Sequence, residues 1–230
     1  MKTTLIAIGN CGFNIANDMI EAEIIIPSDY IVCDSDVDEL QNKKLGRKCR
    51  TIRLQSFEGN LNTDLIPLVS EIVPEDTNLV VICAGMGGHT GSRYAPLIAM
   101  AAQALNKKVI SVYATAFNKF EGENVQMRSK WGFLQQQIAS DFCVYQDNNF
   151  LKKDLMLDEM NSPLIHALKA LYSARPISEW PNITTSEIKE IMVETAKEYS
   201  PVMIHNFYSK KNIDFDTRKS MFNEIIALNS

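Results

Sequence analysis

The sequence predicts an α/β fold, a parallel, Rossmann-like sheet covered by helices on both faces in three layers. Short apolar runs, such as residues 79–83 and 108–114, alternate with segments whose apolar residues recur at helical spacing. The runs are apolar throughout, which is typical of strands buried on both faces. The chain has 230 residues, of which 46% are hydrophobic, and this is enough to build one sizeable core.

We expect six strands in the first 150 residues, at 3–8, 30–33, 50–54, 79–83, 108–114 and 141–145. Helices are expected between them, after residue 14, at 62–73, after the glycine-rich segment that ends at residue 92, and after residue 122. The rest of the chain is mostly helical, with apolar spacing over 164–171 and 185–199 and a last helix capped by Asp214 or Asp216. One further candidate strand lies at 201–208.

Composition excludes several classes of protein. The net charge is −5 with acids and bases mixed, so no nucleic-acid partner is expected, because binding to phosphates needs a clustered basic surface. The longest apolar runs are too short to cross a bilayer, and the N-terminus lacks the apolar stretch of a signal peptide. The five cysteines have no C-x-x-C spacing, and the three histidines are far apart. We therefore expect a cytoplasmic protein without disulfides or a metal site.

A glycine-rich loop follows the strand at 79–83 and precedes a long helix. A strand, a glycine turn and a helix bring unpaired N–H groups and the positive end of a helix dipole together. Glycines let a phosphate approach the backbone, and hydroxyls add donors. The pattern predicts a phosphate site, with a plain strand-to-helix turn as the alternative. The residues concerned are Gly85, Gly87, Gly88, Thr90, Gly91 and Ser92.

Other candidate loops fall at the same edge of the predicted sheet. Ligands of parallel α/β sheets bind beyond the carboxyl ends of the strands. No Lys follows the glycines of 85–92, so this is not a Walker loop, and 9–14 lacks the second glycine of a dinucleotide fingerprint. The loops expected at the edge are 9–14, 33–36, 59–64, 85–92, 114–122 and 146–149.

The loop GMGGHTGS at 85–92 resembles the signature loop of the tubulin/FtsZ superfamily. Four further segments are similar to FtsZ in register: IAIGNCGFNIANDMI at 6–20, YIVCDSDVDEL at 30–40, FNKFEGENVQ at 117–126 and DFCVYQDNNFL at 141–151. The resemblance covers about the first 175 residues. By this resemblance, the chain is identified as a short, divergent, FtsZ-like cytoskeletal protein of bacterial type.

The resemblance implies a site for GTP or GDP with Mg²⁺, in which the phosphates lie between 9–14 and 85–92 and the base lies near the end of the strand at 141–145. It assigns no metal ligand. The implied nucleotide-binding residues are Gly9, Asn10, Cys11, Gly12, Asn14, Asp36, Asn62, Gly85, Gly87, Gly88, His89, Thr90, Gly91, Ser92, Glu121 and Asn148.

Several positions depart from the family's pattern. Asn10, Cys11 and Phe13 stand where the first loop has glycines, and His89 replaces the middle glycine of the signature loop. On the core helix, the family presents an aromatic residue and an acid to guanine. The matching positions are near Leu168 and Ser173, and neither side chain can form the acid's paired hydrogen bonds to the base.

The segment NITTSEI at 182–188 resembles the family's Asn-x-Asp-x-x-Asp catalytic loop, which completes the site of a neighbouring subunit. Thr184 and Glu187 stand at the positions of the two acids and are the candidate catalytic residues. Thr184 can hold a water but is no base. The same two residues also fit the capping box of a helix, and the two interpretations are compatible.

We expect a nucleotide-binding domain at 1–175, including the start of the core helix. Residues 176–230 are expected to hold the continuation of that helix, the degenerate catalytic loop and a short, mostly helical C-terminal extension. Most of the family's C-terminal domain is then expected to be absent, and the fold is expected to be a truncated version of the tubulin/FtsZ GTPase-domain type.

The leading functional hypothesis is a GTP-binding protein that acts by nucleotide-dependent head-to-tail self-assembly, or by binding a protein partner, with weak or absent hydrolysis. Three alternatives stay open. One is an active self-assembling GTPase in which Glu187 reaches the next subunit. The second is a scaffold that binds no nucleotide. The third is a dinucleotide enzyme with Asp34 on the ribose.

Overall fold

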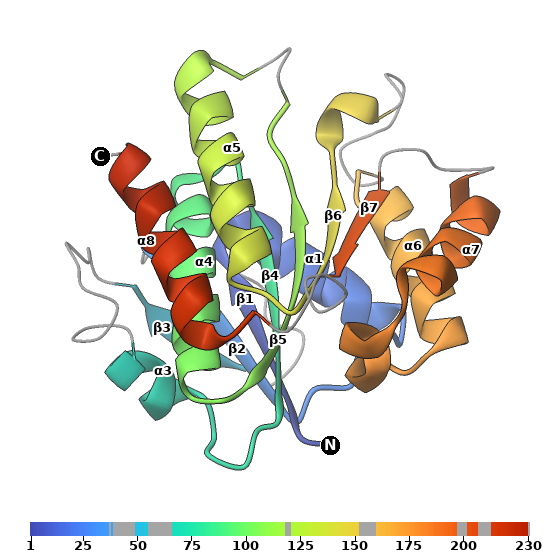
Figure 1. Cartoon of the computed structure of the whole chain (residues 1–230), viewed down its shortest axis with the longest axis horizontal. Coiled ribbons are helices and arrows are strands. Elements are labelled where there is room, and N and C mark those ends of the chain that lie inside the picture. The colour runs from blue at the N-terminus through green and yellow to red at the C-terminus, as the bar shows by residue number, and fades with distance from the viewer. Residues whose placement is uncertain are drawn as a thin grey trace.

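Seven strands form one sheet in the order β3-β2-β1-β4-β5-β6-β7 (Figure 1). The computed structural model describes residues 1–36, 38, 49–54, 66–117, 121–151, 160–196, 202–206 and 213–229. Neighbours among the first six strands are parallel, and β7 pairs antiparallel with β6. The strands are β1 (Thr3–Ile8), β2 (Asp29–Asp34), β3 (Arg50–Arg53), β4 (Leu79–Gly85), β5 (Lys108–Ala114), β6 (Phe142–Gln146) and β7 (Val202–Asn206).

The α/β fold with a parallel sheet is confirmed, and each predicted strand lies within two residues of an observed one at its start. Every residue of β1 and β4 is buried, as expected for central strands with helices on both faces. The candidate strand at 201–208 is β7. Its antiparallel direction was not predicted, because apolar periodicity carries no information on which neighbour a strand pairs with.

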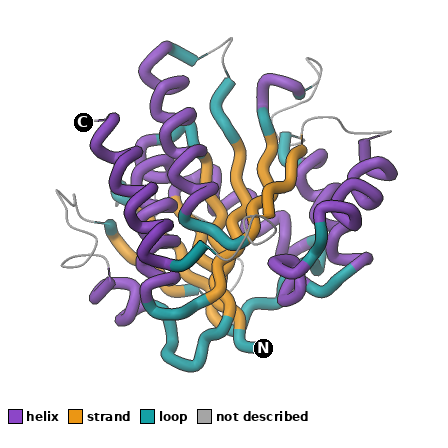
Figure 2. The backbone as a smooth tube through the Cα atoms, in the orientation of Figure 1, coloured by secondary structure: helices purple, strands orange, loops and turns teal. Residues whose placement is uncertain are grey.

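Helices cover both faces of the sheet, so that the molecule has three layers (Figure 2). One face carries α1 (Gly9–Glu21), α6 (Ser162–Ala174), the 3₁₀ helix η4 (Ile177–Asn182) and α7 (Thr185–Ala196). The other face carries α3 (Ile66–Ile72), α4 (His89–Ala104), α5 (Glu123–Ile138) and α8 (Phe215–Asn229). None of the helices in the described part of the chain is long and apolar enough to span a membrane.

The order of the strands puts a topological switch point between β1 and β4. From β1 the chain moves outward to β2 and β3, and from β4 it moves the other way to β5 and β6. The helices that follow β1 and β4 leave for opposite faces, because α1 packs in one core and α4 in the other. In sheets of this kind, the crevice at the switch point is where ligands bind.

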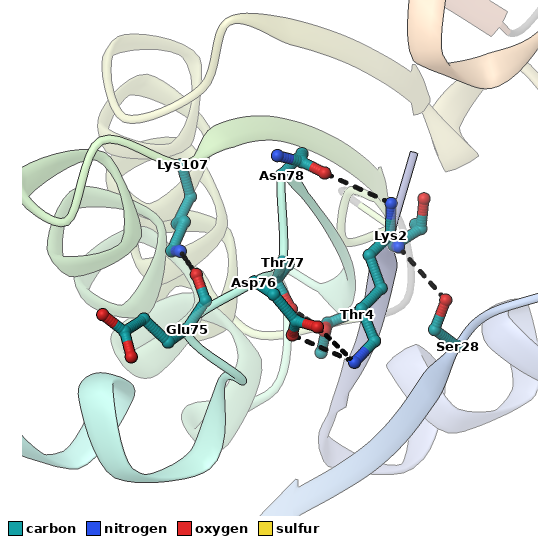
Figure 3. Close-up of polar contacts among 9 residues, drawn as sticks. Lys2, Thr4, Ser28, Glu75, Asp76, Thr77, Asn78 and Lys107 are labelled. Atoms are coloured by element: carbon teal, nitrogen blue, oxygen red, sulfur yellow. Dashed lines mark hydrogen bonds and ion pairs between the residues drawn. The ribbon is translucent and has the colours of Figure 1, made fainter.

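Polar contacts close the opposite, amino edge of the sheet (Figure 3). The Lys2 ammonium lies 2.8 Å from the Asp76 carboxylate. The hydroxyls of Thr4 and Thr77 are 2.8 Å apart and buried. The Lys107 ammonium donates to the main-chain carbonyl of Glu75. These bonds tie the starts of β1 and β5 to the turn before β4 and identify the edge that the glycine loops do not occupy.

The core helix is shorter than expected. We predicted that it continues past residue 175, but α6 ends at Ala174 and Arg175 is extended, with φ −151° and ψ 140°. Pro176 explains this end, because a proline excludes the helical conformation from the residue before it. The Trp180 side chain of η4 then packs against Phe142, with ring centroids 6.0 Å apart. Phe142 begins β6, so the chain has reached the amino edge of the sheet.

The last helix, α8, packs against α4 and α5, and a buried ion pair joins it to the residue before β6. The Arg218 guanidinium lies 3.0 Å from the Asp141 carboxylate, and both side chains are buried. Asp141 also accepts a hydrogen bond from the main chain of Val109 at 2.9 Å. Phe222, on the same helix, is fully buried in the core on this face of the sheet. Asp214 caps α8 by accepting from the main chain of Thr217 at 2.7 Å, as its position predicted.

Candidate functional site

Two helix N-termini converge on the carboxyl edge of the sheet at the switch point. α1 begins directly after β1 and α4 directly after Gly88, and neither N-terminus has a side-chain cap or an acid in its first turn. The first N–H groups of a helix have no partner within it, and they carry the positive end of the helix dipole. Two such ends at one point favour an anion. We predicted a loop at 9–14, but the structure has helix from Gly9.

A pocket of about 360 Å³ lies between these two ends. Nine of the predicted nucleotide-binding residues line it, so the structure brings most of the predicted site together. Three further residues line it that the resemblance did not assign: Ile8, Asp34 and Ser35. The nine predicted residues are Gly9, Asn10, Cys11, Asp36, Gly85, Gly88, His89, Thr90 and Gly91.

The glycines of the site serve different purposes. A Cβ on Gly12 would overlap with the carbonyl oxygen of Cys83, and one on Gly91 would overlap with that of Gly85. These two glycines let α1 and α4 pack directly on β4. Gly88 has no atom within 4 Å of the place where its Cβ would stand, and Gly9 has a φ of +71° that favours glycine. Among these four glycines, Gly88 is the one that neither packing nor backbone conformation requires, and the space beside it is open to a ligand.

The two hydroxyls of the signature loop are already hydrogen-bonded. The Thr90 hydroxyl lies 2.7 Å from that of Ser35 and 3.3 Å from Asp34 Oδ1, which joins the start of α4 to the end of β2. The Ser92 hydroxyl donates to the carbonyl of Gly88 at 2.7 Å and does not line the pocket. Ser92 thus tightens the first turn of α4, and Thr90 remains at the pocket wall.

Cys11 narrows the pocket. It is exposed at the mouth, yet its Cβ lies 2.6 Å from the place where a Cβ on Gly85 would stand, so the thiol rests on the glycine. The protein atoms around the sulfur desolvate it, and this desolvation, with the charges of Asp18 and Glu121, raises the pKa of the thiol to about 11. At neutral pH the side chain is therefore an uncharged thiol, which does not repel a phosphate.

The remaining predicted residues lie away from this pocket. Asn14 is exposed on α1, and Gly87 packs towards Ala116. The Glu121 carboxylate accepts from the main chain of Phe117 at 2.6 Å, so it is already engaged before α5 begins. Asn148 lies past the end of β6 in the 3₁₀ helix η2 (Asn148–Phe150). Asn62 falls outside the described residues.

The charge of the pocket is mixed. Asp34 and Asp36 contribute carboxylates, and the helix N-termini contribute the opposite potential. Carboxylate oxygens are ligands that Mg²⁺ prefers. Within the described ranges, no group of three or more His, Cys, Asp or Glu side chains could hold a metal ion. The residues present therefore fit a cation that shares its ligands with bound phosphates, and they do not form a metal site of their own.

Thr184 and Glu187 form the capping box of α7. The Glu187 carboxylate accepts from the main-chain nitrogen of Thr184 at 2.8 Å and from its hydroxyl at 2.6 Å. Its other oxygen accepts from the Arg175 guanidinium at 2.7 Å. The bonds from Thr184, followed by the one from Arg175, lower the pKa of Glu187 to about 2. Both carboxylate oxygens are thus occupied, which supports the structural interpretation of this pair.

This pair lies at the edge of the sheet opposite the pocket. α7 follows η4, whose Trp180 packs on Phe142 at the start of β6. The pocket lies beyond the ends of β1 and β4, and these strands run parallel to β6 through β5. Within one chain, Thr184 and Glu187 cannot act on a ligand held in the pocket.

No protein-family model matches the chain. It is similar to the cell division protein FtsZ of Mycoplasmopsis pulmonis, with 26% identity over 206 residues, which are 82% of this chain and 52% of the relative. The FtsZ of Rickettsia felis is 25% identical over 84% of this chain and 46% of its own length. The FtsZ of Magnetospirillum gryphiswaldense is 30% identical over 66% of this chain and 28% of its own length. The chain spans about half the length of the first two relatives.

Solved structures show the same likeness in three dimensions. An FtsZ dimer from M. jannaschii matches with a TM-score of 0.60 and 19% identity over 76% of this chain and 55% of that one. A GTPγS-bound protofilament of CetZ2 from Haloferax volcanii matches with a TM-score of 0.60 and 19% identity over 79% of this chain and 62% of that one. TubZ of Clostridium botulinum phage c-st matches with a TM-score of 0.58 and 17% identity over 82% of this chain and 64% of that one. At these identities the likeness shows the fold.

Proposed function

We propose that this chain, which has the fold of the tubulin/FtsZ superfamily, binds GTP or GDP between α1 and α4 and assembles with copies of itself when the nucleotide is bound. Hydrolysis is weak or absent. The observation that carries the proposal is the convergence of two uncapped helix N-termini on a pocket at the switch point of the sheet. The N–H groups of Gly9, Asn10, His89 and Thr90 would hold the phosphates, and Mg²⁺ would neutralise part of their charge.

Assembly is supported by the relatives and by the position of the catalytic-loop residues. The matched structures include an FtsZ dimer, a CetZ2 protofilament and a PhuZ201 filament. In this chain, Thr184 and Glu187 lie opposite the pocket, where they could face the pocket of a second copy stacked head to tail. Because Glu187 is held by Thr184 and Arg175, it is a poor candidate for a free base, which is the basis for expecting little hydrolysis.

A scaffold without nucleotide is the second candidate, and specific residues favour it. Cys11 fills part of the space above Gly85, and Asp34 and Asp36 add negative charge to a pocket meant for an anion. Calorimetric titration with GTP, GDP and ATP in the presence of Mg²⁺ separates the two candidates. Binding of GTP or GDP supports the proposed function. If none of the three nucleotides binds, the scaffold is the better account.

A further inference from the structure

We propose that Gln146 is a positioning residue that holds the Asn148 side chain with its amide nitrogen towards the ligand, so that the site reads a purine base through an acceptor atom. Gln146 is the last residue of β6 and is fully buried. It was not among the residues predicted from the sequence, although a glutamine that ends an otherwise apolar strand is a signal that could have identified it. The inference rests on the proposed nucleotide site and extends it to the base.

The orientation of the Gln146 amide is fixed by a main-chain carbonyl. Its Nε2 atom donates to the oxygen of Met160 at 2.9 Å and to Asn148 Oδ1 at 2.8 Å. A carbonyl oxygen can only accept, so the Gln146 atom that faces Met160 must be the nitrogen. That same nitrogen faces Asn148. The Asn148 atom turned towards Gln146 must therefore be its oxygen.

The orientation of the Gln146 amide leaves its oxygen without a hydrogen bond from the described residues, which costs free energy. Its Oε1 atom is buried and has no hydrogen-bond partner. Buried acceptors without a donor are uncommon in folded proteins and call for an explanation. Turning the amide over would leave the Met160 carbonyl facing another oxygen. The two bonds made by the nitrogen thus hold the amide in place, although the oxygen stays unpaired.

The Asn148 side chain keeps its hydrogen-bond donors available for a ligand. Its oxygen is taken by Gln146, so its free side-chain atom is the nitrogen, with two N–H groups. No residue in the described part of the chain accepts a hydrogen bond from that nitrogen. The main-chain nitrogen of Asn148 also donates a long hydrogen bond, at 3.4 Å, to the Thr115 hydroxyl. Asn148 is therefore a preorganised donor at the carboxyl edge.

The distance from the phosphate pocket suits a nucleoside. The pocket lies beyond β1 and β4, and β6 is two strands from β4. With about 4.8 Å between neighbouring strands, Asn148 is about 10 Å along the edge. Gln146 bonds Met160, which lies two residues before α6, so this contact lies on the sheet face that α1 and α6 cover. A nucleotide whose phosphates rest on the start of α1 can place its base there.

A side-chain nitrogen that can only donate hydrogen bonds distinguishes bases by their acceptor atoms. Guanine offers O6 and N7 as acceptors, and its 2-amino group is a donor that Asn148 cannot recognise. Hypoxanthine has the same two acceptors without the amino group. The positions expected to read guanine's donors from the core helix hold Leu168 and Ser173. The wild-type chain should therefore bind inosine diphosphate (IDP) as tightly as GDP, within about twofold.

The experiment titrates the full chain calorimetrically with GDP, IDP and inorganic pyrophosphate in the presence of Mg²⁺. Pyrophosphate reports on the phosphate pocket alone. Gln146→Leu removes both bonds from Nε2 and frees the Asn148 amide to turn. We expect this variant to lose about tenfold in affinity for GDP and IDP and to bind pyrophosphate within about twofold of the wild type. Asn148→Ala should show the same pattern.

Three results would overturn the inference while leaving the nucleotide site intact. They are a wild type that binds GDP at least tenfold more tightly than IDP, a Gln146→Leu variant with unchanged affinity for GDP, and one whose affinity for pyrophosphate falls as far as that for GDP. The first needs no variant, so it holds even if Gln146→Leu fails to fold. A wild type that binds none of the three ligands would overturn the proposed function, and this inference with it.

Discussion

At the pocket, single residues decide how closely a phosphate can approach the backbone. The glycines at 9–14 and 85–92 were predicted as one phosphate cradle, but the structure separates them into two kinds. Gly12 and Gly91 sit where any side chain would overlap with the main chain of β4. Gly88 faces open space. A sequence shows that glycines are present, but the reason for each depends on which atoms the fold brings next to it.

The two kinds of glycine should respond differently to alanine. Gly91→Ala should lower the free energy of unfolding by about 1–3 kcal/mol, because the new methyl group meets the carbonyl of Gly85. Gly88→Ala should cost less than about 1 kcal/mol, since its φ of −74° suits any residue and only the N-cap preference is lost. Urea unfolding of both variants checks this. Equal losses would mean that the packing of α4 on β4 is not as described.

At the scale of elements, central strands such as β1 and β4 could be predicted because each is a short apolar run buried on both faces. The starts of α1 and α4 could not be predicted, because the glycines at and next to these helix N-termini, Gly9 and Gly88, are typical of loops in a sequence. The partner of Glu187 also escaped prediction. Thr184 follows from the capping-box spacing, but Arg175 is twelve residues away and reaches Glu187 only because the chain reverses direction after Pro176.

The Glu187 interaction predicts a pH dependence of stability. Its pKa falls from the usual 4.5 to about 2 in the folded chain, so its contribution is complete above pH 4.5 and is lost as the pH falls through 2. Glu187→Gln should therefore be less stable than the wild type at pH 7, and the difference should shrink between pH 4.5 and 2. Urea midpoints across this range measure it. Glu190→Gln, an exposed acid on the same helix, is the control and should show no such convergence.

The docking of α8 depends on one buried charge pair. Arg218→Met removes the cation and leaves the Asp141 carboxylate buried, with Val109 and Gln103 as its remaining donors. Removing one partner of a buried pair is strongly destabilising, so we expect a loss of about 3 kcal/mol in unfolding free energy. Glu224→Met, an exposed charge on the same helix, should change it by less than about 0.5 kcal/mol. Equal effects of the two variants would contradict the described docking.

At the scale of the whole molecule, the pocket and the catalytic-loop residues lie at opposite edges of one sheet. The resemblance in sequence predicted both sets of residues and a catalytic loop that serves a neighbouring subunit. Within this chain, the two sets are separated by the path of the chain along α6 and around η4. In the proposed function, such a chain would complete a hydrolytic site only together with another copy. Assembly and hydrolysis are therefore linked in the proposed function.

This link predicts how GTP turnover depends on concentration. Turnover per chain should be weak and should rise with protein concentration, because in the proposed assembly the loop that holds Thr184 and Glu187 faces the pocket of the next copy. Phosphate release, measured over a range of chain concentrations with Mg²⁺ and saturating GTP, tests this. A measurable rate per chain that stays constant as the chain is diluted would show that a single copy suffices, contrary to the geometry.

The central claim is that nucleotide phosphates rest between the starts of α1 and α4, and Cys11 provides a direct probe of it. Cys11 is exposed at the pocket, whereas Cys33, Cys83 and Cys143 are buried. The measurement is alkylation of Cys11 by iodoacetamide at mildly alkaline pH, followed by peptide mass spectrometry, with and without saturating GDP and Mg²⁺. We predict that GDP protects Cys11 and that pyrophosphate does so too. Alkylation of Cys11 at the same rate with and without GDP would contradict the account.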